Sequence, residues 1–237
     1  MKHVKIFEDY QSDKREQFFQ DCRKTKLTNE QLNFLKGKMR GTWSIDDKGL
    51  INVDGNFICI DSDITKLPVK FGKITGNFSL ADCEYLTSLE GSPSEVGGLF
   101  TCIGCHALTS LKNAPETVRE DFNCASCVCL TSLEGAPSEV GSDFSCYSCP
   151  SLVSLKGAPK KVRNFFCYDC KSLLSLKYAP YKTRGIYFND SPNINPKEIK
   201  LYGEDEELFN KWLKSDHDVE DFIYTNRGAL TGKKFGF

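Results

Sequence analysis

Residues 144–162 read FSCYSCPSLVSLKGAPKKV, and the chain repeats this stretch. Counting this one, five near-copies begin 22, 22, 22 and 21 residues apart, at Phe78, Phe100, Phe122, Phe144 and Phe165. The shared pattern is F-x-C-x-x-C-x-x-L-x-S-L-x-x-A-P-x-x-V, and degraded copies begin at Phe57 and Ile186. Near-copies with one period indicate a repeat architecture in which each copy is one structural unit.

One repeat predicts a short strand followed by a return path. Phe144 and Cys146 alternate with more polar residues, which is typical of a strand with one buried face. Cys149 follows after a turn, the later Leu and Val residues bury the return path, and Pro159 prevents a long helix there. Because one repeat cannot cover its own apolar edge, we expect the repeats to stack about 4.8 Å apart, with Phe on Phe, Cys on Cys and Leu on Leu.

Helices are expected to cover both ends of the stack. Thr28 and Gln31 form a capping-box pattern, and residues 14–24, with Phe18, Phe19 and Cys22, suggest an earlier helix. Residues 203–213 place acidic residues ahead of an amphipathic apolar pattern, which favours a helix because acids near a helix N-terminus oppose its dipole. We therefore predict an α+β repeat solenoid in three parts: an N-terminal helical cap over 1–42, short parallel strands over 43–197 with the coil starting at 43–55, and a C-terminal helical cap with a loose tail over 198–237.

The order of buried positions resembles the leucine-rich-repeat frame L-x-x-L-x-L-x-x-N/C, whose period is about 20–29 residues. Phe144 and Cys146 match the strand leucines of that frame, and Cys149 matches its Asn/Cys position. The cysteines depart from the asparagine that often stands there. The resemblance implies a leucine-rich-repeat-like solenoid of short parallel strands.

The same region also resembles repeat proteins of tailed phages. The resemblance rests on VDGNF at 53–57, ITKLPVKFGKITGNF at 64–78 and LTSLEGSPSEVGG at 86–98, and on the start MKHVKIFEDY. It covers about residues 43–195 and implies a phage-encoded protein that blocks or redirects a host protein, such as a defence protein, inside a bacterium. Such scaffolds serve many roles, so the resemblance is specific for architecture.

The overall charge and hydropathy give no sign of a nucleic-acid or membrane partner. The formal net charge is −1, from 31 basic and 32 acidic residues, so there is no global attraction to nucleic acid or to an anionic membrane. No apolar run approaches the roughly 18 residues of a membrane span, and the charged start lacks the apolar core of a secretory signal. We expect a cytoplasmic protein whose thiols stay reduced.

Twelve cysteines need an explanation, and ten of them lie between Cys83 and Cys170. They follow the repeat as Phe and Leu do, and Leu80 replaces one of them, which an apolar column tolerates and a metal site does not. We therefore expect buried cysteines whose S–H groups satisfy nearby carbonyls, with no metal and no cofactor. Two alternatives stay open: zinc held by two stacked C-x-x-C pairs, and redox chemistry, which usually places C-x-x-C at a helix start. Storage without reductant is expected to oxidise some of these thiols.

Enzyme motifs are missing from the sequence. There are three histidines, His3, His106 and His217, and His106 follows Cys105 directly, which is unfavourable for a catalytic pair. No phosphate-binding loop, dinucleotide fingerprint, nucleophile elbow or zinc-protease motif is present. We expect a non-enzymatic protein with no catalytic residues.

Function is then expected from the outward positions of the strands. These positions are small in the early repeats and become aromatic and acidic in the late ones. Exposed aromatic residues beside polar ones are typical of protein interfaces. The alternative is that some of them pack against the C-terminal helix. The predicted partner-binding site consists of Tyr147, Phe166, Tyr168, Asp169, Tyr187, Asn189 and Asp190.

The return paths also change in charge along the chain. Early ones carry Glu95, Glu116 and Glu139, whereas late ones carry a secondary basic patch of Lys160, Lys161, Arg163, Lys182 and Arg184. Such a patch suits phosphate or an acidic protein. We expect a protein partner, with two alternatives: a phage structural or assembly component that self-associates, and a nucleic-acid binder that uses the late basic residues.

Overall fold

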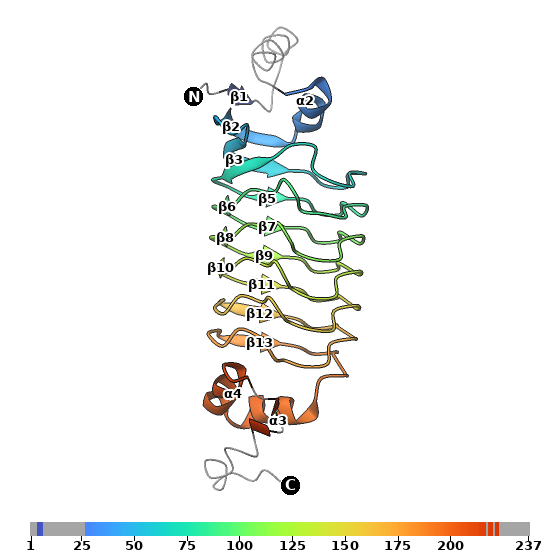
Figure 1. Ribbon diagram of the computed structural model, residues 1–237, viewed down its shortest axis with the longest axis vertical. Helices are drawn as coiled ribbons and strands as arrows, with labels where there is room; N and C mark the ends of the chain where they lie inside the picture. The colour runs from blue at the N-terminus through green and yellow to red at the C-terminus, as the bar shows by residue number, and fades with distance from the viewer. Residues whose placement is uncertain (1–3, 7–26, 217, 220, 223–237) are drawn as a thin grey trace.

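The computed structural model describes residues 4–6, 27–216, 218–219 and 221–222. They form a parallel β-solenoid of about six turns spaced by about 22 residues, which confirms the predicted repeat solenoid. Figure 1 shows the turns stacked in one elongated column, with α2 and β1 at one end and α3 and α4 at the other. The described residues contain few helices, so the expected α+β class applies only in part.

The N-terminal end of the stack is an antiparallel hairpin. β2 (Met39–Ile45) pairs antiparallel with β3 (Ile51–Ile58), and β1 (Val4–Ile6) pairs antiparallel with β2. Residues 43–55, expected as the start of the coil, span this hairpin instead. Its turn closes because Asp46 Oδ1 accepts two main-chain N–H groups, each at 2.9 Å.

A short helix, α2 (Asn29–Leu35), packs beside this hairpin. Its predicted capping box is present: the Gln31 N–H donates to Thr28 Oγ1 at 3.2 Å, and the Thr28 N–H donates to Gln31 Oε1 at 2.9 Å. The expected helix over residues 14–24, with Phe18, Phe19 and Cys22, lies outside the described residues. The helical cap at this end is therefore shown only in part.

β3 is the branch point of the sheet. Its first half pairs in parallel with β4 (Phe71–Ile74), and its last two residues pair in parallel with β5 (Phe78–Ser79). Two columns of short parallel strands run on from these pairs. The valine column continues through β6 (Glu95–Val96), β8 (Thr117–Val118) and β10 (Glu139–Val140). The phenylalanine column continues through β7 (Phe100–Thr101), β9 (Phe122–Asn123), β11 (Phe144–Ser145), β12 (Asn164–Phe166) and β13 (Gly185–Tyr187).

The predicted phenylalanine ladder is present in the core. Ring centroids of successive turns lie 5.0–5.6 Å apart and their planes diverge by 6–18°, from Phe78 through Phe165. All of these rings are fully buried. Such aromatic pairs contribute about 0.5–1.5 kcal/mol each beyond the burial of their surface. One residue type in one register thus makes the same contact at every turn.

The second cysteine of each repeat bonds to the previous turn. Its Sγ donates to the main-chain carbonyl at the first cysteine position one turn earlier, for example Cys127 to Cys102 O at 3.2 Å and Cys149 to Cys124 O at 3.4 Å. In the last turn, Ser191 Oγ makes the same bond to Cys167 O at 3.2 Å. The position therefore requires a small hydrogen-bond donor, which is the role expected of these cysteines.

Side-chain oxygens join the turns at the corner between the two columns. The Asn77 N–H donates to Asn56 Oδ1 at 2.7 Å, and the Leu99 N–H donates to Asn77 Oδ1 at 2.9 Å. Later in the stack the Asp143 N–H donates to Asp121 Oδ1 at 2.9 Å. These bonds satisfy main-chain groups that a short strand leaves without a partner.

Two turn positions in each repeat adopt a left-handed backbone. At the position before the second cysteine, φ lies between 51° and 71°, and Asp, Ser and Gly occupy it. At the position before the Ala-Pro or Ser-Pro pair, φ lies between 67° and 95°, and the occupants are Gly91, Asn113, Gly135, Gly157 and Tyr178. Tyr178 is a bulky side chain at φ 71°, where a non-glycine residue costs on the order of 1–3 kcal/mol.

Two helices, α3 (Pro196–Glu204) and α4 (Glu206–Leu213), close the C-terminal end. Glu198, in the first turn of α3, is buried against the last turn of the solenoid, where its carboxylate accepts the Ser175 hydroxyl at 2.9 Å and the Leu176 N–H at 2.6 Å. The expected amphipathic helix is present as α4, with its acids in the first turn. The expected tail, 223–237, lies outside the described residues. No helix in the described ranges has the length and apolar character to cross a membrane.

The left-handed backbone at the position before the Ala-Pro or Ser-Pro pair predicts opposite effects for two substitutions. Tyr178→Gly should raise the free energy of unfolding by about 0.5–1 kcal/mol, because glycine adopts positive φ without steric cost. Gly157→Ala should lower it by about 2 kcal/mol, because an added Cβ would lie 2.3 Å from Leu133 O at φ 95°. Urea unfolding measures both, and a destabilising Tyr178→Gly would contradict the assignment of strain.

Candidate functional site

The outward face of the phenylalanine column changes character along the stack. In the early turns its residues are small and bond to their own main chain. The Ile103 N–H donates to Thr101 Oγ1 at 3.2 Å, and the Ala125 N–H donates to Asn123 Oδ1 at 2.9 Å. The polar side chains at these early positions already hydrogen-bond to nearby main-chain N–H groups, so they offer few hydrogen-bonding groups to a partner.

In the late turns the same positions carry two stacked ring pairs. Tyr147 stacks on Tyr168 with centroids 4.6 Å apart and planes 4° apart, and Phe166 stacks on Tyr187 at 4.8 Å and 16°. They stack because equivalent residues of neighbouring parallel strands lie about 4.8 Å apart. Tyr187 is 44% exposed and the other three are half-buried. These four residues are called the aromatic patch below.

A polar rim borders the aromatic patch. Asp169 and Asp190 occupy left-handed turn positions at its edge, and Asn189 and Asp190 are exposed. Ser148 Oγ donates to Asp169 Oδ2 at 3.1 Å. Burial, reinforced by Tyr147 and Asp169, raises the pKa of Tyr168. The structure thus brings the seven predicted partner-binding residues to one edge of the sheet face.

The C-terminal helices pack beside this face. Tyr202 of α3 meets Phe188 edge-on at 5.6 Å, and its hydroxyl accepts the Ile186 N–H at 3.2 Å. In the described part of the chain, the ring contacts of α3 and α4 run to Phe188 and among themselves, not to the aromatic patch. The sequence left open whether a C-terminal helix packs against the late aromatic residues. In the structure, α3 makes this ring contact with Phe188.

The five predicted basic residues lie along the valine side of the last turns, and all are exposed. Lys161 and Lys182 are partners in a parallel bridge, and the Arg184 N–H donates to Arg163 O at 2.8 Å. Arg163 differs from the others because it makes a two-bond ion pair with Asp143, at 2.9 and 3.0 Å. This guanidinium holds the pKa of Asp143 below its usual value. Lys160, the fifth residue, precedes Lys161 on the same return path.

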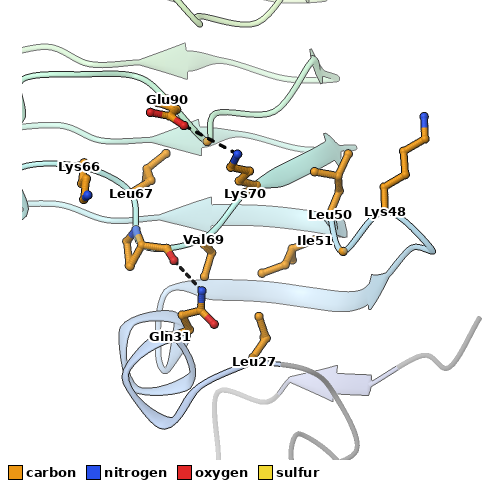
Figure 2. A pocket seen from close by; sticks show the side chains of 13 residues that line it. Leu27, Gln31, Lys48, Leu50, Ile51, Lys66, Leu67, Val69, Lys70 and Glu90 are labelled. Atoms are coloured by element: carbon orange, nitrogen blue, oxygen red, sulfur yellow. Dashed lines mark hydrogen bonds and ion pairs between the residues drawn. The ribbon is translucent and has the colours of Figure 1, made fainter.

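A hollow of about 420 Å³ lies between α2 and the first turns. Apolar residues such as Leu67 and Val69 line it, together with three lysines, of which Lys70 lies 3.7 Å from Glu90. Figure 2 shows Lys48 pointing away from Lys66 and Lys70, so the three amino groups do not converge. Sequence reasoning missed this hollow because its walls come from separate elements with no common motif.

A second hollow, of about 390 Å³, lies between the last turn and the C-terminal helices. Glu198 and Lys177 line it. Burial raises the pKa of Glu198, although its bonds to Leu176 and Ser175 oppose the shift. Lys177 Nζ donates to Trp212 O at 2.9 Å and to Ser215 O at 2.6 Å. These charged groups therefore anchor the helices to the solenoid.

The cysteines are arranged for packing. Within the described ranges, no group of three or more His, Cys, Asp or Glu residues is placed to hold a metal ion. Cys105 Sγ donates to Leu80 O at 3.2 Å, whereas the neighbouring His106 lies 3.7 Å from Glu84. His3 and His217 lie outside the described residues. Burial raises the pKa of Cys170 to about 11, and it raises the pKa of Cys105 and Cys149 further. The reactive thiolate is therefore scarce at these three positions, whereas a hydrogen bond from Cys83 lowers the pKa of Cys59 to about 7.

The comparisons with known proteins give no relative. No protein-family model matches the chain, and no curated protein and no solved structure is significantly similar to it. The surface chemistry of the solenoid is therefore the basis for a functional hypothesis.

The raised thiol pKa values predict that the protein loses stability at alkaline pH. An unfolded thiol ionises near pH 8.5, whereas Cys170 ionises at about 11 in the fold. The folded chain thus holds protons that the unfolded chain releases, so this stability is complete below about pH 8.5 and declines as pH rises toward 11. Each such thiol contributes about 1.4 kcal/mol per pH unit in that window.

The matched variants for this experiment are Cys170→Ser and Cys129→Ser. Serine makes the same bond at position 191, so Cys170→Ser keeps a donor while removing one titrating group. Cys129 is exposed, so its substitution should leave the pH dependence unchanged. Urea unfolding midpoints measured between neutral and alkaline pH should fall less steeply for Cys170→Ser than for Cys129→Ser. Equal slopes would contradict the role of burial.

Proposed function

We propose that this chain is a non-enzymatic protein-binding module, and that its partner binds the aromatic patch and its polar rim. Two stacked pairs of aromatic rings carry the proposal. They stand on an outward face whose earlier strand residues, such as Thr101 and Asn123, hydrogen-bond to their own main chain. Aromatic side chains beside polar groups dominate the binding energy of protein interfaces. They also lose little rotamer entropy when a partner covers them.

The placement of the aromatic patch supports this proposal. The rings stand on β11, β12 and β13 and the turns after them, in a register held by parallel pairing. A rigid sheet presents its side chains with little reorganisation, which reduces the entropic cost of association. Asp169, Asn189 and Asp190 add hydrogen-bond acceptors at the rim, which suits a partner that offers N–H or cationic groups around an apolar centre.

We further propose, from the resemblance to tailed-phage repeat proteins, that the protein is phage-encoded and acts in the bacterial cytoplasm. Its partner would be a host protein, for example a defence protein that it inhibits. The competing proposal is a phage structural or assembly component. That alternative requires the chain to associate with itself or with particles.

A pull-down from bacterial lysate under reductant tests the aromatic patch. The variant Tyr147→Ala/Tyr168→Ala/Tyr187→Ala should lose the captured partner, since removing an interface hot spot costs on the order of 2 kcal/mol or more. The matched control is Tyr85→Ala/Tyr178→Ala, because Tyr85 and Tyr178 are 57% and 52% exposed elsewhere on the solenoid. Circular dichroism and urea unfolding confirm that both variants are folded.

The outcomes separate the proposals. A partner that is retained by the control and lost by the triple variant supports the aromatic patch as the site. A partner retained by both variants shows that binding occurs elsewhere and contradicts the proposed site. If wild type captures only copies of itself, as sizing chromatography would show, the structural or assembly role replaces the binding module.

A further inference from the structure

At the start of the valine side, exposed charges form ion pairs across neighbouring turns. Lys73 and Glu95 are direct cross-strand partners, and Lys73 Nζ lies 2.8 Å from Glu95 Oε2. Arg119 Nη2 approaches the other Glu95 oxygen, also at 2.8 Å. Opposite charges on neighbouring strands stabilise a sheet by about 0.2–1 kcal/mol per pair. The start of this face is therefore electrostatically satisfied.

The last turns of the same face instead place like charges opposite each other. Lys161 and Lys182 are direct bridge partners, so two like charges face each other across neighbouring turns. Arg163 and Arg184 are also adjacent, since the Arg184 N–H donates to Arg163 O. Like charges in direct opposition destabilise a sheet. Folding alone gives no reason for this arrangement.

Four of these cations have no counter-ion in the described chain. No carboxylate of the described residues lies within 4.0 Å of their amino or guanidinium groups, whereas Arg163 is paired with Asp143. Lys214, at the end of α4, adds a fifth positive charge nearby, with its Nζ 4.7 Å from the ring centroid of Tyr181. The four unpaired residues, called the basic ladder below, are Lys160, Lys161, Lys182 and Arg184.

We propose that the basic ladder binds an acidic segment of the protein partner, next to the aromatic patch. This inference rests on the proposed function and specifies the chemistry of its partner. Neighbouring turns lie about 4.8 Å apart, and alternate residues of one turn lie about 6.6 Å apart. Residues three or four apart on a helix have Cβ atoms about 5–6 Å apart, so acidic residues at that spacing on a helical segment match these distances.

One partner can reach both surfaces. Arg184 lies three residues before Tyr187 on the same turn, and Arg163 lies three residues before Phe166 on the turn before it. The basic ladder is on the valine side and the aromatic patch is on the phenylalanine column of these same turns. A partner with an acidic stretch for the basic ladder, and with apolar residues flanked by N–H or cationic groups for the aromatic patch, would complement both surfaces.

A polypeptide fits better than a nucleic acid. Asp169 and Asp190 border the aromatic patch and would repel a phosphodiester backbone that ran across it. The chain as a whole carries a net charge of −1. Even with Lys214, these five cations are fewer than the roughly 6–10 phosphate contacts of strong nucleic-acid binders. The negative rim and the small number of cations disfavour a nucleic acid that crosses both surfaces, whereas a polypeptide can confine its acidic residues to the basic ladder.

The test uses the full chain and two labelled probes. One is a synthetic amphipathic helical peptide with glutamate at every fourth position, and the other is an oligothymidylate of equal charge. Fluorescence anisotropy at low salt should show peptide binding that weakens about tenfold or more in Lys182→Glu/Arg184→Glu. The matched control is Lys48→Glu/Lys66→Glu, which changes the charge equally at the opposite end. It should change the affinity less than about twofold.

A stability measurement distinguishes binding from damage to the fold. Lys182→Glu replaces a like-charge pair with an opposite-charge pair against Lys161, so its thermal midpoint should rise while peptide binding weakens. A merely structural role for Lys182 would lower the midpoint. A lowered midpoint, absent peptide binding, or equal weakening in the control would each overturn the inference. Tighter binding of oligothymidylate than of the peptide would overturn it in favour of a nucleic-acid surface.

The two proposals can fail separately. If the Tyr147→Ala/Tyr168→Ala/Tyr187→Ala variant loses its partner while the charge-reversal variant keeps that partner, the basic ladder is excluded and the aromatic patch stands. If the charge-reversal variant loses the acidic peptide while the tyrosine variant keeps its protein partner, the aromatic patch is excluded. The basic ladder then stands as an acidic-segment site independent of that patch.

Discussion

Each turn of this solenoid depends on the next turn to cover it. Its short strands have few main-chain partners within the turn, and its apolar side chains face the edge as well as the interior. The strands of the phenylalanine column therefore pair in parallel from turn to turn, and the buried rings stack in the same direction. Because each unit is completed by its neighbour, stability is cooperative along the stack. Hairpin β2–β3 and helices α3 and α4 cover the two open ends.

This dependence explains why so many cysteines lie in the core. The position after the first turn must be small, must be buried, and must donate a hydrogen bond to the carbonyl one turn earlier. A thiol meets all three requirements, and Ser191 meets them in the last turn. Burial raises the pKa of Cys105, Cys149 and Cys170, so at these positions the feature that first suggests metal or redox chemistry acts as packing and hydrogen bonding.

Because the repeats are so alike, surface residues that differ between repeats are easy to identify. A residue that serves folding recurs in its column, as the phenylalanines and leucines do. The aromatic patch and the basic ladder do not recur, and both occur on the last turns. The like-charge bridge between Lys161 and Lys182 opposes the stability of the sheet, whereas Lys73 and Glu95 support it at the start of the same side. These departures from the repeat are the basis for both proposals.

The sequence by itself determined the period, the buried columns and the grouping of the aromatic patch. The period and the buried columns follow from a pattern that every repeat carries, and counting along that register places Phe144 and Cys149 inside and Tyr168 on the outward face. Only the tertiary structure decided that residues 43–55 form a hairpin, that α3 covers Phe188, and that Arg163 pairs with Asp143 while Lys182 faces Lys161. The hairpin and the cap occur once in the chain, so no periodicity predicts them. The ion pairs depend on which side chains about twenty residues apart come within reach, and this is settled by packing across turns rather than by the order of residues within one.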